Sequence, residues 1–348
     1  MPVSDADMVA AWTQVLALSR LEAGNIVTVV TSSNTRPQTL STAIIAAASM
    51  GAVVNRLDLQ PMNGERSLSR DPLGPVGTTP LSGNAAAVAA LKESHLVLDL
   101  MALLFSPEQQ EILNAGTRML LAVEPPEVLV RLLPTVQDRR RVREAAARID
   151  AAKEMLIVSD AGTDLRCRLG EYPAVRAYGF ADEPGRWDHW PSGLVLGVPN
   201  EGSATGTIVV DRGDILLPMK SYVTGPVTLT VEGGFVSSID GGVEAELIVD
   251  YMASFDDPDA YAVSHVGWGL QKRARWSALG LFDREATVGM DARGFEGNVL
   301  LSVGPGSNIA GGRLVAGHLD IPMRNCTVSL DGIVVIREGQ IVAEPRSF

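Results

Sequence analysis

The first part of the chain alternates between short β-branched runs and longer alanine-rich stretches. Residues 25–31 read N-I-V-T-V-V-T, which is typical of a buried strand, and the alanine-rich residues 38–50 lie between Pro37 and Gly51, which predicts a helix. The same alternation predicts further elements at 52–59, 83–92, 95–100, 107–114, 118–123, 127–133 and 136–154. Strands alternating with helices favour a parallel sheet covered by helices, so we expect a Rossmann-like α/β domain over residues 1–155.

The pattern changes beyond this domain. Residues 206–217, 226–239 and 326–336 are β-branched runs interrupted by glycine and by Asp-Gly pairs, which is typical of antiparallel hairpins. One helix is expected among them at 244–255, and a second is expected to begin at 256–259. Residues 156–348 therefore predict a β-rich α+β domain.

Glycine-rich loops give no support for a nucleotide site. The first strand runs into T-S-S-N-T-R-P instead of the glycine-rich turn of a dinucleotide-binding fold. The glycine-rich stretch at 304–312, G-P-G-S-N-I-A-G-G, has the wrong spacing and follows no clear strand-to-helix junction. We expect that stretch to shape a pocket or an interface.

Composition narrows the class of partner. The chain has 348 residues, of which 46% are hydrophobic and 20% charged, and its formal net charge is −12. The negative charge argues against nucleic acid and anionic membrane as partners and favours a small molecule. The N-terminus has no signal-peptide pattern and no apolar run is long enough to cross a bilayer. We therefore expect a cytoplasmic protein in which Cys167 and Cys326 are buried free thiols.

Candidate chemistry depends on histidine, of which the chain has 4. In A-G-H-L-D-I-P-M-R-N-C, residues 316–326, His318 and Asp320 would share one face of a strand. His265 lies in S-H-V-G-W-G-L-Q, where two glycines permit close backbone approach. These three residues match the ligand set of non-haem Fe(II) oxygenases. A zinc hydrolase site and a buried His–Asp hydrogen bond are also compatible with them.

The other two histidines differ in context. His95 opens an apolar strand without a companion ligand, and we interpret it as structural. His189 lies in D-E-P-G-R-W-D-H-W-P, which is so rich in tryptophan, proline and charge that we expect an irregular loop. Such loops commonly carry binding residues.

Long motifs resemble those of the 2,5-dihydroxypyridine 5,6-dioxygenases. The segments that carry the resemblance are L-A-V-E-P-P-E-V-L (121–129), Y-P-A-V-R-A-Y-G-F-A-D-E-P-G-R-W-D-H-W-P-S-G (172–193), S-H-V-G-W-G-L-Q-K-R-A-R-W (264–276) and G-H-L-D-I-P-M-R-N-C (317–326). More distantly, G-T-D-L-R-C-R-L at 162–169, the P-N-E loop and H-L-D are similar to segments of thermophilic-type metalloaminopeptidases. The resemblance implies that the β-rich second domain has the metal-binding fold of that aminopeptidase type.

The resemblance also implies an activity. It makes His265, His318 and Asp320 the ligands of one Fe(II), with 2,5-dihydroxypyridine and O2 converted to N-formylmaleamic acid in nicotinate and pyridine degradation. A metalloaminopeptidase using Zn or Co is the alternative. Such peptidases hold two metals with more histidines, and only His95 and His189 remain to supply them. A metal-stabilised binding protein with the same fold is a third hypothesis.

The remaining site residues follow from the matching motifs. His189 is the spare imidazole of the matching region, so we expect it to be the acid/base for the substrate hydroxyl proton. Leu104 and Phe105 follow a predicted parallel strand at its carboxyl end, where α/β sheets place ligands. Asn200 and Glu201 are expected to hydrogen-bond the substrate or to orient the ligating histidines. The apolar first domain and the resemblance together lead us to expect a homo-oligomer.

Overall fold

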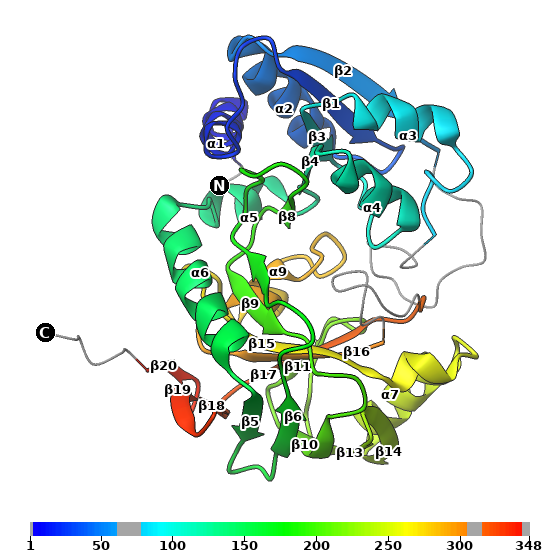
Figure 1. The fold of residues 1–348 in the computed structure, drawn as a ribbon, viewed down its shortest axis with the longest axis vertical. Helices are drawn as coiled ribbons and strands as arrows, with labels where there is room; N and C mark the ends of the chain where they lie inside the picture. The colour runs from blue at the N-terminus through cyan, green and yellow to red at the C-terminus, as the bar shows by residue number, and fades with distance from the viewer. Residues whose placement is uncertain (1–2, 61–77, 305–314, 343–348) are drawn as a thin grey trace, which may run out of the picture. The chain divides into compact units, whose positions relative to one another are not determined.

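The computed structural model describes residues 3–60, 78–304 and 315–342 (Figure 1). The chain divides into two compact units, each assembled from separate stretches. The first unit contains Met1–Arg140, Ala177–Gly193 and Asp283–Met290, and the second contains Arg141–Arg176, Leu194–Phe282 and Asp291–Phe348. The division into domains at residues 155 and 156 stays a prediction, because compactness alone does not show which part folds by itself. The glycine-rich stretch beyond Gly304 lies outside the described residues.

A five-stranded parallel sheet forms the centre of the first unit (Figure 1). Its strands are β1 (Ile26–Thr31), β2 (Val53–Asp58), β3 (Leu96–Asp99), β4 (Arg118–Leu121) and β8 (Trp187–His189), in the order β2-β1-β3-β4-β8. Strands β1, β3 and β4 are buried along nearly their whole length, as expected for strands that are covered on both faces. The predicted Rossmann-like α/β character is confirmed.

Local sequence sets where several helices begin. The helices are α1 (Asp5–Leu18), α2 (Pro37–Ser49), α3 (Ala85–Lys92), α4 (Pro107–Asn114), α5 (Pro126–Arg131) and α6 (Val136–Ala151). Side chains of Ser4, Asn84 and Ser106 accept backbone N–H groups in the first turns of α1, α3 and α4, and a proline opens α2, α4 and α5. No helix among the described residues is both long and apolar enough to span a membrane.

Residues 187–189 correct one prediction. The sequence predicts an irregular loop around His189, and that prediction is wrong, because these residues form β8 beside β4. Met119 pairs with Trp187 and Leu121 pairs with His189. A strand of three residues is too short to show a periodic pattern, and its partner lies far earlier in the chain. Nothing local in the sequence could therefore reveal the pairing.

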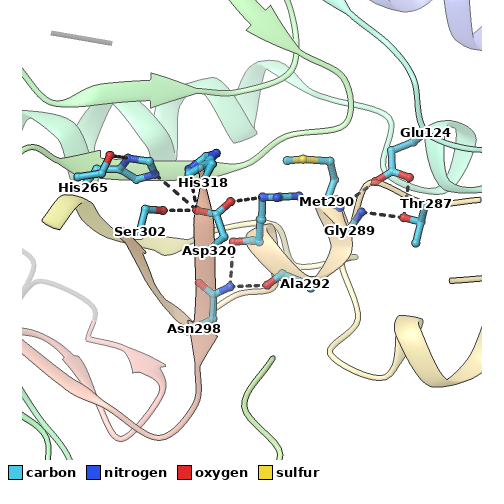
Figure 2. Close-up of polar contacts among 12 residues, drawn as sticks. Glu124, His265, Thr287, Gly289, Met290, Ala292, Asn298, Ser302, His318 and Asp320 are labelled. Atoms are coloured by element: carbon cyan, nitrogen blue, oxygen red, sulfur yellow. Dashed lines mark hydrogen bonds and ion pairs between the residues drawn. The ribbon is translucent and has the colours of Figure 1, made fainter. Parts of the chain in front are cut away.

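A buried carboxylate joins distant parts of the first unit. Glu124 accepts a hydrogen bond from the hydroxyl of Thr287 at 2.6 Å and from the N–H groups of Val288 and Met290 at 3.1 and 2.8 Å (Figure 2). Glu124 is fully buried, so these bonds replace the water that the carboxylate loses on folding. They explain why residues 283–290 belong to this unit.

Two antiparallel sheets dominate the second unit. The larger has the strand order β14-β13-β10-β6-β5-β18-β19-β20, the smaller has β17-β16-β15-β9-β7, and β11 pairs with β12. The bounds are β5 (Glu154–Val158), β6 (Asp164–Arg168), β7 (Val175–Ala177), β9 (Leu194–Gly197), β10 (Thr205–Val210), β11 (Ile215–Leu216), β12 (Ser221–Tyr222), β13 (Val227–Glu232), β14 (Phe235–Gly241), β15 (Val263–Gly269), β16 (Val299–Val303), β17 (Leu319–Met323), β18 (Thr327–Leu330), β19 (Ile333–Arg337) and β20 (Gln340–Ile341). Helices α7 (Val243–Ala253), α8 (Ala278–Leu281) and α9 (Met290–Gly294) and the 3-10 helix Pro258–Tyr261 accompany them. The predicted β-rich α+β character is confirmed.

Two local features of this unit follow from burial and close packing. Cys167 and Cys326 are buried free thiols, as the sequence predicts, and burial raises the pKa of each to about 12. In the smaller sheet, Gly267 of β15 lies so close to β9 that a Cβ atom there would be 1.9 Å from the carbonyl oxygen of Val195. Glycine is therefore required two residues after His265.

A second buried carboxylate ends strand β3. Asp99 is fully buried, and its two oxygens accept the backbone N–H groups of Met101, Ala102 and Leu103 at 3.0, 2.9 and 2.6 Å. Burial outweighs these bonds and raises the pKa of Asp99 from its ordinary 3.8 to about 6. The carboxylate thus holds the loop after β3 in place. When it is charged, its burial lowers the free energy of unfolding.

We predict that Asp99 makes the protein less stable as the pH rises. Between about pH 4 and pH 6 the folded state keeps a proton on Asp99 that the unfolded chain has released, so the free energy of unfolding falls with increasing pH. In Asp99→Asn this contribution disappears. The variant should also be less stable at about pH 5, because one amide oxygen replaces two acceptors for three donors. Thermal unfolding across this pH range measures both effects.

Asp160→Asn is the matched control, because Asp160 is exposed. Burial also raises the pKa of Asp214 to about 6, but Asp214 is unchanged in both proteins. The difference in pH slope between wild type and Asp99→Asn therefore isolates Asp99. Equal slopes would contradict this account.

Candidate metal centre

Strand pairing brings two of the predicted metal ligands together. His265 of β15 lies opposite Ser302 of β16, and Ser302 lies opposite Asp320 of β17. Directly opposed residues on neighbouring strands point to the same face of the sheet. The register therefore places His265, Ser302 and Asp320 in one row, although they are distant in sequence.

His318 joins this row from the chain immediately before β17. Its Nε2 lies 3.1 Å from Oδ1 of Asp320, so the two residues share a face, as their spacing predicts. The hydroxyl of Tyr251 in α7 donates to the carbonyl oxygen of His318 at 3.0 Å and accepts its N–H at 3.3 Å. Beside it, a Cβ at Gly317 would lie 2.5 Å from the ring of Phe255. The backbone of His318 is thus held by α7 and the residues that follow it.

The donor atoms of these residues converge (Figure 2). The Nε2 of His265 lies 3.9 Å from Oδ1 of Asp320, and one donor atom from each of the three residues lies within 4.8 Å of the others. Donors that bind one metal ion at about 2.1 Å are about 3 to 3.5 Å apart, so small side-chain adjustments suffice. In the described part of the chain, this is the one group of histidine, cysteine and acidic residues that could hold a metal.

His265 is in the protonation state that metal binding requires. Burial lowers the pKa of its imidazole to about 3, against the attraction of Asp320. Its Nδ1 lies 2.8 Å from the hydroxyl oxygen of Ser264. A neutral ring that donates from Nδ1 to Ser264 presents the lone pair of Nε2 to a metal, which is the usual arrangement of ligating histidines.

Asp320 is both buried and charged. Burial opposes ionisation, but the charges of His318 and Arg293 hold the pKa of the carboxyl well below its usual range. The Nε of Arg293 donates to Oδ2 at 2.5 Å, and the hydroxyl of Ser302 donates to Oδ1. The carboxylate is therefore available as an anionic ligand near neutral pH.

Three residues predicted for the substrate site, Leu104, Phe105 and His189, lie in the first unit around Trp187. The ring centroids of Trp187 and His189 are 5.3 Å apart, and those of Phe105 and Trp187 are 6.1 Å apart. Leu104 belongs to the buried cluster against which Phe105 and Trp187 pack. The Nδ1 of His189 lies 2.7 Å from the carbonyl oxygen of Pro191. Because a carbonyl only accepts, the neutral ring carries its proton on Nδ1 and its lone pair on Nε2.

Asn200 and Glu201 lie at the turn after β9, in the second unit. The side-chain oxygen of Asn200 accepts a hydrogen bond from the backbone N–H of Glu171 at 3.0 Å. The backbone N–H of Asn200 donates to the carbonyl oxygen of Arg168 at 2.8 Å. Glu201 is exposed, and its N–H donates to the carboxylate of Glu171 at 3.0 Å. These contacts join two turns, and none of them involves the three donors.

Sequence reasoning missed the residues that hold the donors in place. Ser302 interrupts the apolar run V-L-L-S-V, which is a signal of a buried polar contact. Arg293 lies in M-D-A-R-G, which carries no such signal. Tyr251 lies on α7, and its hydroxyl reaches the backbone of His318 only because of how that helix packs. All three depend on tertiary contacts.

The fold and the site define a protein in which a Rossmann-like parallel sheet is combined with antiparallel sheets that carry a candidate site for one metal ion. The sequence profile of the 2,5-dihydroxypyridine 5,6-dioxygenase family matches residues 7–343. The chain belongs to this family, as its motifs predict.

Individual relatives agree with this assignment. A 2,5-dihydroxypyridine 5,6-dioxygenase of Pseudomonas putida KT2440 is 49% identical over 347 residues, which is 100% of this chain and 99% of that protein. A solved structure of the 2,5-dihydroxypyridine dioxygenase from the same strain covers 100% of both chains with 48% identity and a TM-score of 0.96. AmpT from Thermus thermophilus, at 15% identity, covers 97% of this chain and 99% of its own with a TM-score of 0.63, a likeness of fold alone.

We predict that Gly317→Ala destabilises the protein and disturbs His318. The added methyl group meets the ring of Phe255, and such overpacking costs about 1 to 3 kcal/mol. The displaced backbone should also weaken divalent-metal binding about tenfold, as changes around a ligand usually do. Gly225→Ala is the control, because nothing lies within 4 Å of a Cβ there. Equal thermal stability and metal affinity in the two variants would refute the prediction.

Proposed function

We propose that this protein is an Fe(II)-dependent dioxygenase that converts 2,5-dihydroxypyridine and O2 to N-formylmaleamic acid in nicotinate and pyridine degradation. The observation that carries the proposal is the convergence of His265, His318 and Asp320 in a chain of the 2,5-dihydroxypyridine 5,6-dioxygenase family. Two imidazoles and one carboxylate suit mononuclear Fe(II) oxygenases and leave coordination positions open. Both oxygen atoms enter the product, so the reaction needs no second reductant.

The chemistry is divided between the metal and the protein. When bound, Fe(II) would supply the electrons that make dioxygen reactive toward an aromatic ring, which redox-inert zinc cannot do. The two ring hydroxyls of the substrate are para to each other, so a single ion cannot chelate both. Side chains of the protein must therefore orient the ring and manage its proton.

His189 is the acid/base group in this proposal. The carbonyl of Pro191 keeps its proton on Nδ1, so Nε2 can accept the proton of the 5-hydroxyl and return it after ring cleavage. Phe105 and Trp187, with Leu104 beneath them, offer an apolar and aromatic surface suited to a flat pyridine ring. Proton transfer and ring binding thus fall to neighbouring residues.

We also propose roles for two residues of the second unit, an assembly and a location. Asn200 and Glu201 are proposed to contact the substrate or to orient the ligating histidines, and either role would compete with their bonds to Glu171. A homo-oligomer and a cytoplasmic location are proposed on the grounds already given. Light scattering of the purified protein at micromolar concentration tests the oligomer.

The alternative function is a two-metal aminopeptidase. Such a site needs more donors than one mononuclear site, since each ion requires several protein ligands. The described part of the chain offers one group of three donors. His95 is exposed, and its Nδ1 lies 3.1 Å from the backbone N–H of Ile26. The donor set therefore favours the dioxygenase.

Reaction class is the first test of the proposed function. Protein purified without oxygen and loaded with ferrous iron should consume one O2 per 2,5-dihydroxypyridine and bleach its aromatic absorption. Isotopically labelled dioxygen should place both atoms in the product. Zinc-loaded protein should be inactive, because zinc has no accessible redox change. An oxygen electrode and mass spectrometry provide the measurements.

Asp320→Ala tests whether Asp320 is a ligand of the iron. This variant loses the anionic ligand and should lose iron and turnover together, whereas Asp160→Asn, which changes an exposed carboxylate, should keep both. Stoichiometric iron in Asp320→Ala would disprove the ligand set. Release of amine from a leucine anilide without oxygen uptake would favour the aminopeptidase.

We predict that His189→Ala keeps its iron but turns over about 10² to 10⁴ times more slowly near neutral pH, which is the usual contribution of a general base. The loss should shrink as the pH rises, because the substrate then ionises unaided. Metal analysis and the pH dependence of kcat distinguish this from loss of the site.

His95→Ala is the matched control, because it removes an imidazole of the same unit that is exposed and serves a backbone contact. It should keep wild-type kcat at every pH. A His189→Ala protein with the same profile as His95→Ala would show that His189 is only a structural member of β8.

A further inference from the structure

The two oxygens of Asp320 have different surroundings. Oδ1 faces the Nε2 atoms of His265 and His318 at 3.9 and 3.1 Å and accepts the hydroxyl of Ser302 (Figure 2). Oδ2 instead accepts the Nε of Arg293 at 2.5 Å. The Arg293 side chain is 9% exposed and that of Asp320 is 3% exposed, so the pair lies where water screens charge poorly. The reaction proposed above gives this guanidinium no role.

We propose that Arg293 is a positioning residue that keeps Asp320 a one-oxygen ligand and favours the ferrous state of the bound iron. The inference rests on the proposed function, because it requires iron at His265, His318 and Asp320. A carboxylate that binds a metal through both oxygens would need Oδ2, which Arg293 occupies. Oδ1 is the oxygen directed at the histidines, so it would be the one that binds the metal.

The backbone around Arg293 fixes the position of the guanidinium. Arg293 lies on the short helix α9, and the side-chain amide of Asn298 donates to the carbonyl oxygens of Ala292 and Arg293, each at 2.8 Å. The oxygen of the same amide accepts the N–H of Gly269, at the end of β15, at 2.7 Å. One buried asparagine therefore ties the arginine to the strand that carries His265.

Charge explains the effect on oxidation state. Asp320 and Arg293 together carry no net charge, and the imidazoles are neutral ligands, so a bound ferrous ion keeps its charge of two. Oxidation adds one more positive charge close to a buried guanidinium. The repulsion penalises the ferric state more than the ferrous state, and the net charge around a metal is an established control of its reduction potential.

Two substitutions separate charge from hydrogen bonding. Arg293→Gln keeps a donor for Oδ2 but removes the charge, and Arg293→Lys keeps the charge. Arg337→Gln is the control, because it removes one positive charge from an exposed position in the same unit. Each protein is loaded with ferrous iron without oxygen and equilibrated with a redox mediator dye, and the ferric-to-ferrous ratio is read by absorption and electron paramagnetic resonance.

In Arg293→Gln the ferric-to-ferrous ratio at a fixed mediator potential should rise at least about tenfold, which corresponds to about 59 mV for one electron. In Arg293→Lys and Arg337→Gln the ratio should stay within about threefold of wild type. A wild-type ratio in Arg293→Gln overturns the proposal. If Arg293→Gln does not fold, Arg293→Lys decides alone, because a tenfold rise despite the retained charge also overturns it.

Zinc binding distinguishes this failure from failure of the proposed function. Zinc titration of each apoprotein, followed by calorimetry, reports whether the three donors bind a divalent ion without any redox change. A wild-type protein that binds one zinc and one ferrous ion, with no change of potential in Arg293→Gln, refutes the role of Arg293 alone. A wild-type protein that binds neither ion at these residues refutes the metal site and the inference with it.

Discussion

The pairing register of β15, β16 and β17 is the constraint on which the site depends. It sets His265, Ser302 and Asp320 in one row across three strands, and His318 joins from the chain that enters the last strand. A shift of one residue in any strand would turn its side chain to the opposite face and dismantle the row. The close approach at Gly267 restricts such a shift, because only glycine permits β9 to lie against β15 there. The register of these largely apolar strands thus sets the positions of the polar side chains of the site.

The site also shows how a buried charge is made tolerable before any metal binds. Asp320 already has Arg293 on one oxygen and Ser302 on the other, with His318 close by. Small zinc domains in which the metal alone neutralises the ligands are unfolded without it. Here Arg293, Ser302 and His318 already lie against the carboxylate, so an ion would not be its only partner.

The sequence predicts much of the fold and names three residues that the structure brings together, but it does not predict the residues that hold them in place. The parallel sheet and most helices of the first part follow from local patterns, because strand propensity, proline at helix starts and capping residues act within a few positions. The two-residue spacing of His318 and Asp320 likewise predicts that their side chains lie on the same face of a strand. The partners of Asp320 do not follow, since Arg293 and Ser302 are brought to it by tertiary contacts and strand register. The strand at 187–189 could not be predicted for the same reason, because these residues form a strand only by pairing with β4.

Strand β8 has a consequence for how the chain is made. The parallel sheet of the first unit is finished only when residues 187–189 have been synthesised, after the chain has already passed through β5, β6 and β7. Until then β4 presents an open edge of unpaired backbone groups, which is a template for pairing with other chains. A nascent chain, or a fragment cut near residue 155, therefore exposes the unpaired edge of β4. In the full-length protein β8 pairs with this edge. Synthesis of the middle of the chain is the interval in which aggregation competes with folding.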